Sequence, residues 1–443
     1  MTTVTRWYIY TAAALFAPLL LPSPLPFASV SAMAQSMMAV PARPPIAPPH
    51  RDSHATPAVP APANPPPATP PAAAAQPKQL PPRIPFTAAD DAAAVIPGMP
   101  DARFFADSTA DFTGALPAQP GPWLILSSGG EDGAFGAGFL SGLSAGGKRP
   151  DYAVVTGVSA GALLAPFAFA GSRYDGTLHD VFTKITAADI FEVGNTGESF
   201  VDTWPLKDLI AKEITPALVA DIAAAHKSGR RLFIVTTDLD AGRSVVWNMG
   251  AIAAHGGDAA LKLFRSVMLA SSAIPGGFPP VLIDVEAHGK TFQEMHVDGG
   301  VGGQFFVAPA ALMASTSDYR LPATELDIVI NTVLQPEFEV VQRATPSILG
   351  QTVSTAVKVD TQLMLDRTYL AAKRSGVGFN VAAIPAGFSA PSRGPFDPDY
   401  MGALFQTGYE LGKSATPFAG APPPYATPPV QQTQDPEKTG ANR

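Results

Sequence analysis

The chain of 443 residues contains no cysteine. This absence excludes disulfides, a lipid-modified amino-terminal cysteine and a cysteine nucleophile. The chain also lacks a basic cluster, and its formal net charge is −8, which argues against nucleic acid as a partner. The apolar segment near the start, residues 7–21, has only 15 residues and includes Pro18, so it is too short for a comfortable membrane span.

The first 34 residues have the features of an export signal. Arg6 supplies the positive start, the short apolar segment follows, and Ala32-Met33-Ala34 before Gln35 matches an A-x-A cleavage site. We therefore predict a signal peptide over residues 1–34 and an exported protein, periplasmic or secreted. The alternative interpretation is an uncleaved anchor.

Proline is concentrated outside the expected folded core. Of the 48 prolines, 17 lie between positions 41 and 85, interleaved with alanine. Such composition favours extended chain that cannot bury a core. We expect a disordered spacer over residues 35–85, one folded domain over 86–415 and a disordered tail over 416–443.

Strand-like and helix-like segments alternate within the expected domain. Short β-rich segments include residues 123–126, 152–156, 232–237 and 326–330. Helical patterns cover residues 133–145, 160–170, 258–270, 347–373 and 398–413. This alternation predicts an α/β fold with a mostly parallel central sheet covered by helices on both faces.

The segment 157–161, Gly-Val-Ser-Ala-Gly, lies between an expected strand and an expected helix. A nucleophilic serine needs a sharp turn that lifts its hydroxyl clear of the backbone. Gly157 and Gly161 let the strand and the helix approach without Cβ clashes. We predict that Ser159 is a nucleophile.

A second glycine-rich loop, residues 127–136, also joins an expected strand to an expected helix. Backbone amides in such a loop can point at one place and bind a phosphate or an oxyanion. The Gly-Lys-Ser/Thr ending of a phosphate loop is absent, and a tight structural turn is the simpler alternative. With a nucleophile elbow some 25 residues later, we favour an oxyanion hole.

The base that would activate Ser159 is the remaining question. No histidine follows His296, whereas an α/β-hydrolase places its histidine after the other two catalytic residues. A carboxylate is therefore the better candidate. Asp298 precedes Gly299 and Gly300 at an expected strand end, although a surface turn is the commonest structure for that tripeptide.

Together these segments resemble the patatin-like phospholipase family. The resemblance runs from about residue 123 to about residue 413. It rests on the glycine-rich loop, on segment 157–161, on segment 270–280 (Ala-Ser-Ser-Ala-Ile-Pro-Gly-Gly-Phe-Pro-Pro) and on segment 298–300 (Asp-Gly-Gly). The four elements occur in order over some 180 residues, which is more specific than any one of them.

The resemblance implies a three-layer α/β/α hydrolase that cleaves acyl esters of lipids with a Ser-Asp dyad and no histidine. Ser159 would be the nucleophile and Asp298 the general base. Residues 272–275 would form a loop near the site. The oxyanion would be held by backbone amides of the first loop. The residues assigned to the oxyanion hole are Gly129, Gly130 and Glu131, and Gly133 is a further glycine of the motif.

The chain departs from the family pattern at two positions in this loop. Ser128 stands where a leading glycine is usual, and Asp132 replaces a basic residue. An aspartate cannot hold a phosphate head group. The departure leaves the dyad intact but weakens the case for phospholipid as the preferred substrate.

Two other functions fit the same residues. One is a serine esterase, lipase or acyltransferase acting on another acyl ester, and the other is a non-catalytic lipid-binding protein. We expect a lipid or membrane-surface substrate, no nucleic acid, no cofactor and no metal. Asp238 and Asp240 could suggest calcium, but their position fits a strand end and turn better.

Overall fold

The computed structural model describes residues 80–194 and 197–423. The signal peptide expected at residues 1–34, most of the spacer expected at 35–85 and the tail beyond 423 lie outside these ranges. Among the described residues, no helix has both the length and the apolar character needed to cross a bilayer.

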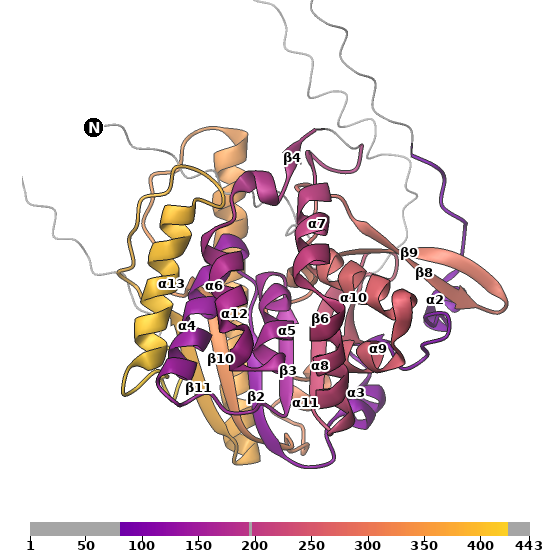
Figure 1. Cartoon of the computed structure of the whole chain (residues 1–443), viewed down its shortest axis with the longest axis horizontal. Coiled ribbons are helices and arrows are strands. Elements are labelled where there is room, and N and C mark those ends of the chain that lie inside the picture. The colour runs from indigo at the N-terminus through magenta and orange to yellow at the C-terminus, as the bar shows by residue number, and fades with distance from the viewer. Residues whose placement is uncertain (1–79, 195–196, 424–443) are drawn as a thin grey trace, which may run out of the picture. The chain divides into compact units, whose positions relative to one another are not determined.

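The centre of the structure is a sheet in which five adjacent strands are parallel (Figure 1). In spatial order these are β6 (Arg231–Asp238), β3 (Val154–Val158), β2 (Gly121–Leu126), β10 (Ala323–Val333) and β11 (Gly378–Ile384). Antiparallel strands extend the sheet beyond β6. They are β7 (Arg243–Asn248), β1 (Arg103–Phe105), β9 (Lys290–Asp298) and β8 (Val281–Ala287). The predicted mixed α/β fold with a mostly parallel central sheet is confirmed.

Side chains alternate between the two faces of the sheet and feed two separate cores. In β2, Leu124 and Leu126 belong to one core, and Trp123 and Ile125 belong to the other. The continuous apolar runs of these strands are thus explained by burial on both faces.

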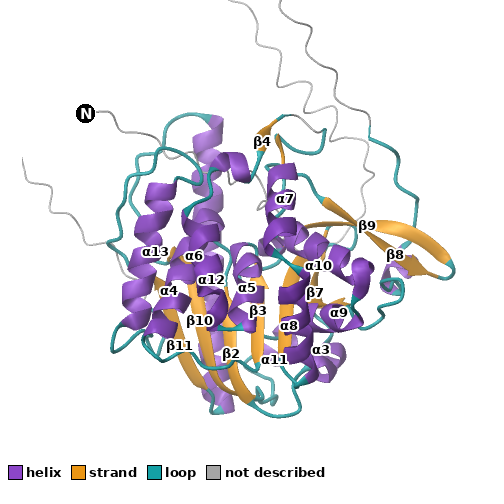
Figure 2. Ribbon diagram, in the orientation of Figure 1, coloured by secondary structure: helices purple, strands orange, loops and turns teal. Residues whose placement is uncertain are grey.

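Helices cover both faces and complete three layers (Figure 2). The first core contains residues of α4 (Gly133–Ala145), α5 (Ala160–Ala170), α6 (Asp175–Thr183), α7 (Trp204–Glu213), α8 (Pro216–Lys227), α9 (Met249–His255), α10 (Gly257–Ser271) and α13 (Pro398–Lys413). The second contains residues of α3 (Thr109–Ala115), α11 (Ala310–Met313) and α12 (Thr345–Ser375). The helices expected at 133–145, 160–170 and 398–413 are confirmed with the same bounds.

Segments that precede and follow the expected domain in the sequence also contact it. Before it, Arg83 pairs with Asp240 at 2.5 Å, and the short helix α2 (Ala88–Ala92) follows. After it, Ala419 forms a β-bridge with Val381. Residues 80–85 and 416–423 therefore lie against the domain that the sequence places at 86–415.

A small two-stranded sheet, β4 (Glu192–Val193) and β5 (Val201–Asp202), stands apart from the main sheet. The backbone amides of Phe200 and Val201 donate to the carbonyls of Gly276 and Gly277. The small sheet is thereby tied to the loop after α10, at the end toward which the parallel strands run (Figure 1).

Candidate active site

Ser159 lies on a strained turn between β3 and α5. Its backbone angles are φ 55° and ψ −122°. Residues other than glycine rarely adopt this combination, which costs on the order of 1–3 kcal/mol. A Cβ at Gly157 would collide with the carbonyl of Gly161, and a Cβ at Gly161 would collide with the carbonyl of Leu126. The two motif glycines are thus required by close approach of the backbone, as the sequence predicts.

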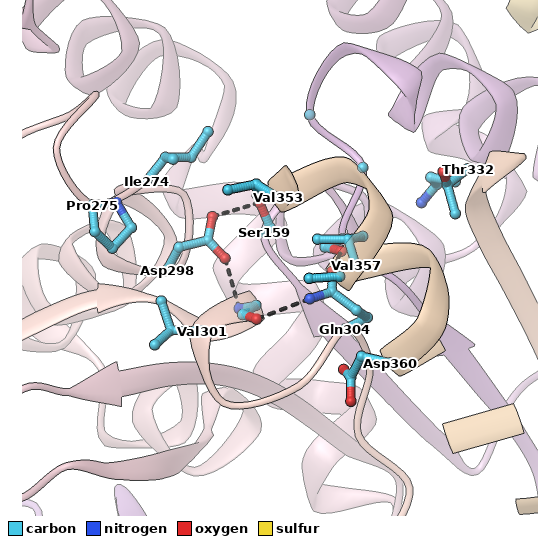
Figure 3. Close-up of a pocket in the computed structure, with 16 residues that line it drawn as sticks. Ser159, Ile274, Pro275, Asp298, Val301, Gln304, Thr332, Val353, Val357 and Asp360 are labelled. Carbon is cyan, nitrogen blue, oxygen red and sulfur yellow. Dashed lines mark hydrogen bonds between the residues drawn. The ribbon is translucent and has the colours of Figure 1, made fainter. Parts of the chain in front are cut away.

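The structure brings Ser159 and Asp298 together. The Ser159 hydroxyl donates to Asp298 Oδ2 at 2.6 Å, and the Gly300 amide donates to Asp298 Oδ1 at 2.7 Å (Figure 3). Asp298 ends β9, and Gly299 begins the 3-10 turn η4 (Gly299–Val301). The Asp-Gly-Gly segment is therefore a buried turn that aims its carboxylate at the serine, rather than a surface turn.

Burial raises the pKa of Asp298 to about 6, against the lowering effect of the hydrogen bonds from Ser159 and Gly300. Both side chains are almost completely buried. A carboxyl group with this pKa is ionised at neutral pH, yet it holds a proton more readily than an exposed aspartate. The pair can therefore transfer a proton from the hydroxyl to the carboxylate.

The glycine-rich loop lies beside this pair. Gly129 and Gly130 line the same cavity as Ser159 and Asp298. Gly130 has a φ of 58° and begins the turn η1 (Gly130–Asp132), after which Gly133 is the first residue of α4. The loop backbone at Gly129 and Gly130 therefore faces the same cavity as the Ser159 hydroxyl.

The side chains of Glu131 and Asp132 accept hydrogen bonds from residues near the carboxyl-terminal end of the folded domain. The Phe396 amide donates to the Glu131 carboxylate, and the Tyr400 hydroxyl donates to Asp132 Oδ1 at 2.6 Å. Neither residue lines the cavity. Asp132, the acidic residue that departs from the family pattern, is thus bonded to α13, and Glu131 is bonded to the loop before α13. Neither carboxylate places a charge in the cavity wall.

Three further polar residues, Ser271, Gln304 and Asn331, brace the site, and none of them is predicted as a site residue from the sequence. Ser271 Oγ accepts a hydrogen bond from the Ser159 amide at 3.0 Å and donates to the Val235 carbonyl at 2.7 Å. Ser271 lies in segment 270–280, which carries part of the family resemblance, so that segment was the available signal.

Gln304 and Asn331 join loops that are distant in the sequence. Gln304 Nε2 donates to the Gly300 carbonyl at 2.9 Å, and the Gln304 carbonyl accepts from the Ser128 amide at 2.8 Å. Asn331, near the end of β10, accepts from the Gly136 amide and donates to the Ser127 carbonyl, both at 3.0 Å. No sequence motif marks either residue.

The cavity beside the dyad has a volume of about 200 Å³ and a mainly apolar wall. Its apolar residues come from segment 270–280, from η4 and from α12; they are Ile274, Pro275, Val301, Val353, Ala356 and Val357. Asp298 and Asp360 are the acidic residues of the wall, and none of its residues is lysine, arginine or histidine. The cavity is smaller than the roughly 300–1,000 Å³ of sites that enclose a whole ligand.

His296 is buried away from the dyad. Its Nδ1 lies 2.9 Å from Thr236 Oγ1, and its Nε2 lies 3.2 Å from Glu294 Oε2. Trp247 donates to the same threonine at 2.8 Å. These partners satisfy a neutral imidazole, and burial lowers the pKa of His296. The ring therefore has a structural explanation that does not involve Ser159.

One group of side chains among the described residues has the spacing of a metal site. Ligand atoms of Asp238, Glu294 and His296 lie within 4.8 Å of one another. Arg103 binds both oxygens of Glu294, one of them at 2.7 Å, and this guanidinium already neutralises the carboxylate. Burial, together with the nearby carboxylates of Glu294 and Asp91, raises the pKa of Asp238 to about 7.

Comparison with known proteins supports the resemblance found in the sequence. Residues 124–311 match the family described as "Patatin-like phospholipase". No curated protein matches the chain. Among solved structures, VipD from Legionella pneumophila matches with 11% identity and a TM-score of 0.34, over 67% of this chain. The match covers 66% of VipD, slightly less than two thirds of that protein.

Proposed function

Over residues 124–311 this chain belongs to the patatin-like phospholipase family, and we propose that it is a lipid acyl hydrolase. It would cleave carboxylic esters of lipids through Ser159 and Asp298. The observation that carries this proposal is the 2.6 Å hydrogen bond from the Ser159 hydroxyl to the Asp298 carboxylate on the wall of an apolar cavity.

The reaction begins with proton transfer from Ser159 Oγ to Asp298 Oδ2. The oxygen then forms a bond to the ester carbonyl carbon, and the carbonyl oxygen takes the negative charge. Asp298 returns the proton to the departing alcohol when the ester bond breaks, which leaves an acyl-enzyme on Ser159. Water then attacks the acyl carbon while Asp298 takes one of its protons. The bond from that carbon to Ser159 Oγ breaks, Asp298 returns the proton to this oxygen, and the free acid leaves.

The glycine-rich loop would stabilise the charge that develops on the carbonyl oxygen. Backbone amides around Gly129, Gly130 and Glu131 are the proposed donors, since this loop begins a helix beside the serine. Asn331 and Gln304 fix the loop from its two sides, and donors fixed in advance need no reorganisation during the reaction.

The cavity wall supports an acyl chain as the bound part of the substrate. The apolar side chains of α12 and of residues 274–275 offer no hydrogen bonds, so they suit a hydrocarbon chain better than a polar group. The absence of a cation among the cavity residues means that phosphate recognition has no support there.

Hydrolysis of a panel of esters tests the proposal. The panel is a short p-nitrophenyl ester, a monoacylglycerol and a phospholipid, with Ser159→Ala as the matched inactive control. We expect hydrolysis by the natural protein, a loss of several orders of magnitude in Ser159→Ala and covalent labelling of Ser159 by a fluorophosphonate probe. Hydrolysis by a well-folded Ser159→Ala protein at the natural rate would refute the proposal.

A further inference from the structure

The most exposed large apolar side chains of the described residues occur in two segments only. They are Phe338 at 92%, Val193 at 85%, Val340 at 79% and Phe200 at 71% exposure. Val193 lies in β4, Phe200 directly precedes β5, and residues 338 and 340 belong to the connection from β10 to α12. Such side chains are unfavourable in water, and contiguous apolar surface marks an interaction site.

Both segments adjoin the cavity that contains Ser159. Phe200 bonds through its amide to Gly276, the residue after the cavity residue Pro275. The other segment leads into α12, whose Val353 and Val357 line the cavity. Figure 3 shows the two sides of the cavity, with Ile274 and Pro275 opposite the helix that carries Val353 and Val357.

The apolar surface continues along α12 outside the cavity. Ile348, Val359 and Leu363 are exposed on this helix and line a shallow groove. Ala356 and Asp360 border both the groove and the cavity of Ser159. The groove on the outer surface of α12 therefore adjoins the cavity of the candidate nucleophile at Ala356 and Asp360.

We propose that the surface formed by Phe200, Phe338, Val340 and Ile348 docks this protein onto a lipid surface, with the mouth of the cavity facing the lipid. This inference rests on the proposed function, because a lipid acyl hydrolase must draw its substrate from an aggregate. The small cavity supports it, since only part of a lipid molecule fits inside and the remainder can stay in the lipid surface.

The charges around the surface specify the kind of lipid. Segments 190–204 and 334–348 contain five acidic residues (Glu192, Glu198, Asp202, Glu337 and Glu339) and one basic residue, Arg343. Lys358, on the adjoining part of α12, pairs with Glu337 at 2.7 Å. Anionic lipid repels these acidic side chains, so the surface suits uncharged or zwitterionic lipids. Docking then depends on insertion of the apolar side chains rather than on charge attraction.

Trp204 supplies a local probe of docking. It is half exposed at the start of α7, and its indole donates to Glu192 Oε2 at 2.7 Å. Trp123 and Trp247 are buried in the cores, and Trp7, in the expected leader, is the remaining tryptophan. In a full-length Trp7→Phe protein, fluorescence quenching by brominated phosphatidylcholine vesicles therefore reports contact between the Trp204 region and lipid.

The test compares Phe338→Asp and Val340→Asp with the control Leu370→Asp in this background. Leu370 is 60% exposed near the other end of α12. We expect Trp204 quenching in the parent protein and in the control, weaker quenching on vesicles rich in anionic lipid, and roughly tenfold weaker partitioning of the Phe338→Asp and Val340→Asp proteins. Their hydrolysis of a soluble ester should stay within about twofold of the parent rate.

Three outcomes separate the inference from the proposed function. Absence of Trp204 quenching in the parent protein overturns the inferred docking surface, and so does an equal loss of quenching in the Leu370→Asp and Phe338→Asp proteins. Self-association of the parent that Phe338→Asp abolishes, without quenching by lipid, assigns the surface to a protein contact and also overturns it. Quenching as expected together with no hydrolysis of any ester overturns the proposed function and leaves the docking surface supported.

Discussion

The Ser271 side chain accepts a hydrogen bond from the backbone amide of Ser159 at 3.0 Å. Ser271 in turn donates to the carbonyl of Val235 within β6, so the strained serine is attached to the neighbouring strand as well as to its own. The hydrogen bond links segment 270–280 of the family resemblance to the backbone conformation of Ser159, the candidate nucleophile.

Replacing Ser271 with alanine should impair the chemical step more than folding. The amide of Ser159 would lose its acceptor in a buried site, a cost of about 1–3 kcal/mol, and the φ of 55° would be less firmly held. We expect a fall in kcat of about tenfold or more with little change in KM on a soluble ester. An unchanged kcat, or a KM effect alone, would show that Ser271 does not position the nucleophile.

The activity should depend on pH through Asp298. The base must be deprotonated to accept the serine proton, and burial raises its pKa to about 6. We expect kcat/KM to rise with pH and to level off above about pH 7. Asp298→Asn keeps the size of the side chain but removes its basicity, so activity should fall by a hundredfold or more at all pH values. Circular dichroism spectra and melting temperatures close to those of the natural protein provide the control.

His296 should not be essential. Its nitrogens are occupied by Thr236 and Glu294, and neither partner lines the cavity. We expect His296→Gln to lower turnover by less than roughly tenfold, or about 1.4 kcal/mol of barrier, with a larger effect on melting temperature because the ring is fully buried. A loss as large as that of Ser159→Ala would assign the base to histidine instead.

The chain before residue 80 should be dispensable for hydrolysis, whereas residues 80–93 should stabilise the site. Arg83 pairs with Asp240, and Phe86 stacks on Phe292 of β9 with ring centroids 4.4 Å apart. Since β9 ends at Asp298, loss of these contacts loosens the strand that carries the base. A chain beginning at Leu80 should match the full chain on a soluble ester. A chain beginning at Ala94 should melt at a lower temperature, and equal melting of the two would contradict this assignment.

The sequence by itself determined the fold class, the two candidate catalytic residues and the loops around them. Buried parallel strands are continuous apolar runs, and a nucleophile elbow needs small residues at fixed spacing, so both leave local patterns. The strand predicted at 152–156 lies within two residues of the bounds of β3, and the helix predicted at 160–170 has the same bounds as α5.

Only the tertiary structure decided which distant side chains support the site. Gln304 and Asn331 act through bonds to Gly300, Ser128 and Ser127, which lie elsewhere in the sequence, and a lone amide residue leaves no periodic signal. The position of Asp132, bonded to Tyr400 rather than facing the cavity, also required the packing of α13 against α4. Local spacing encodes turns and strands, whereas contacts between separate elements arise only when the chain has folded.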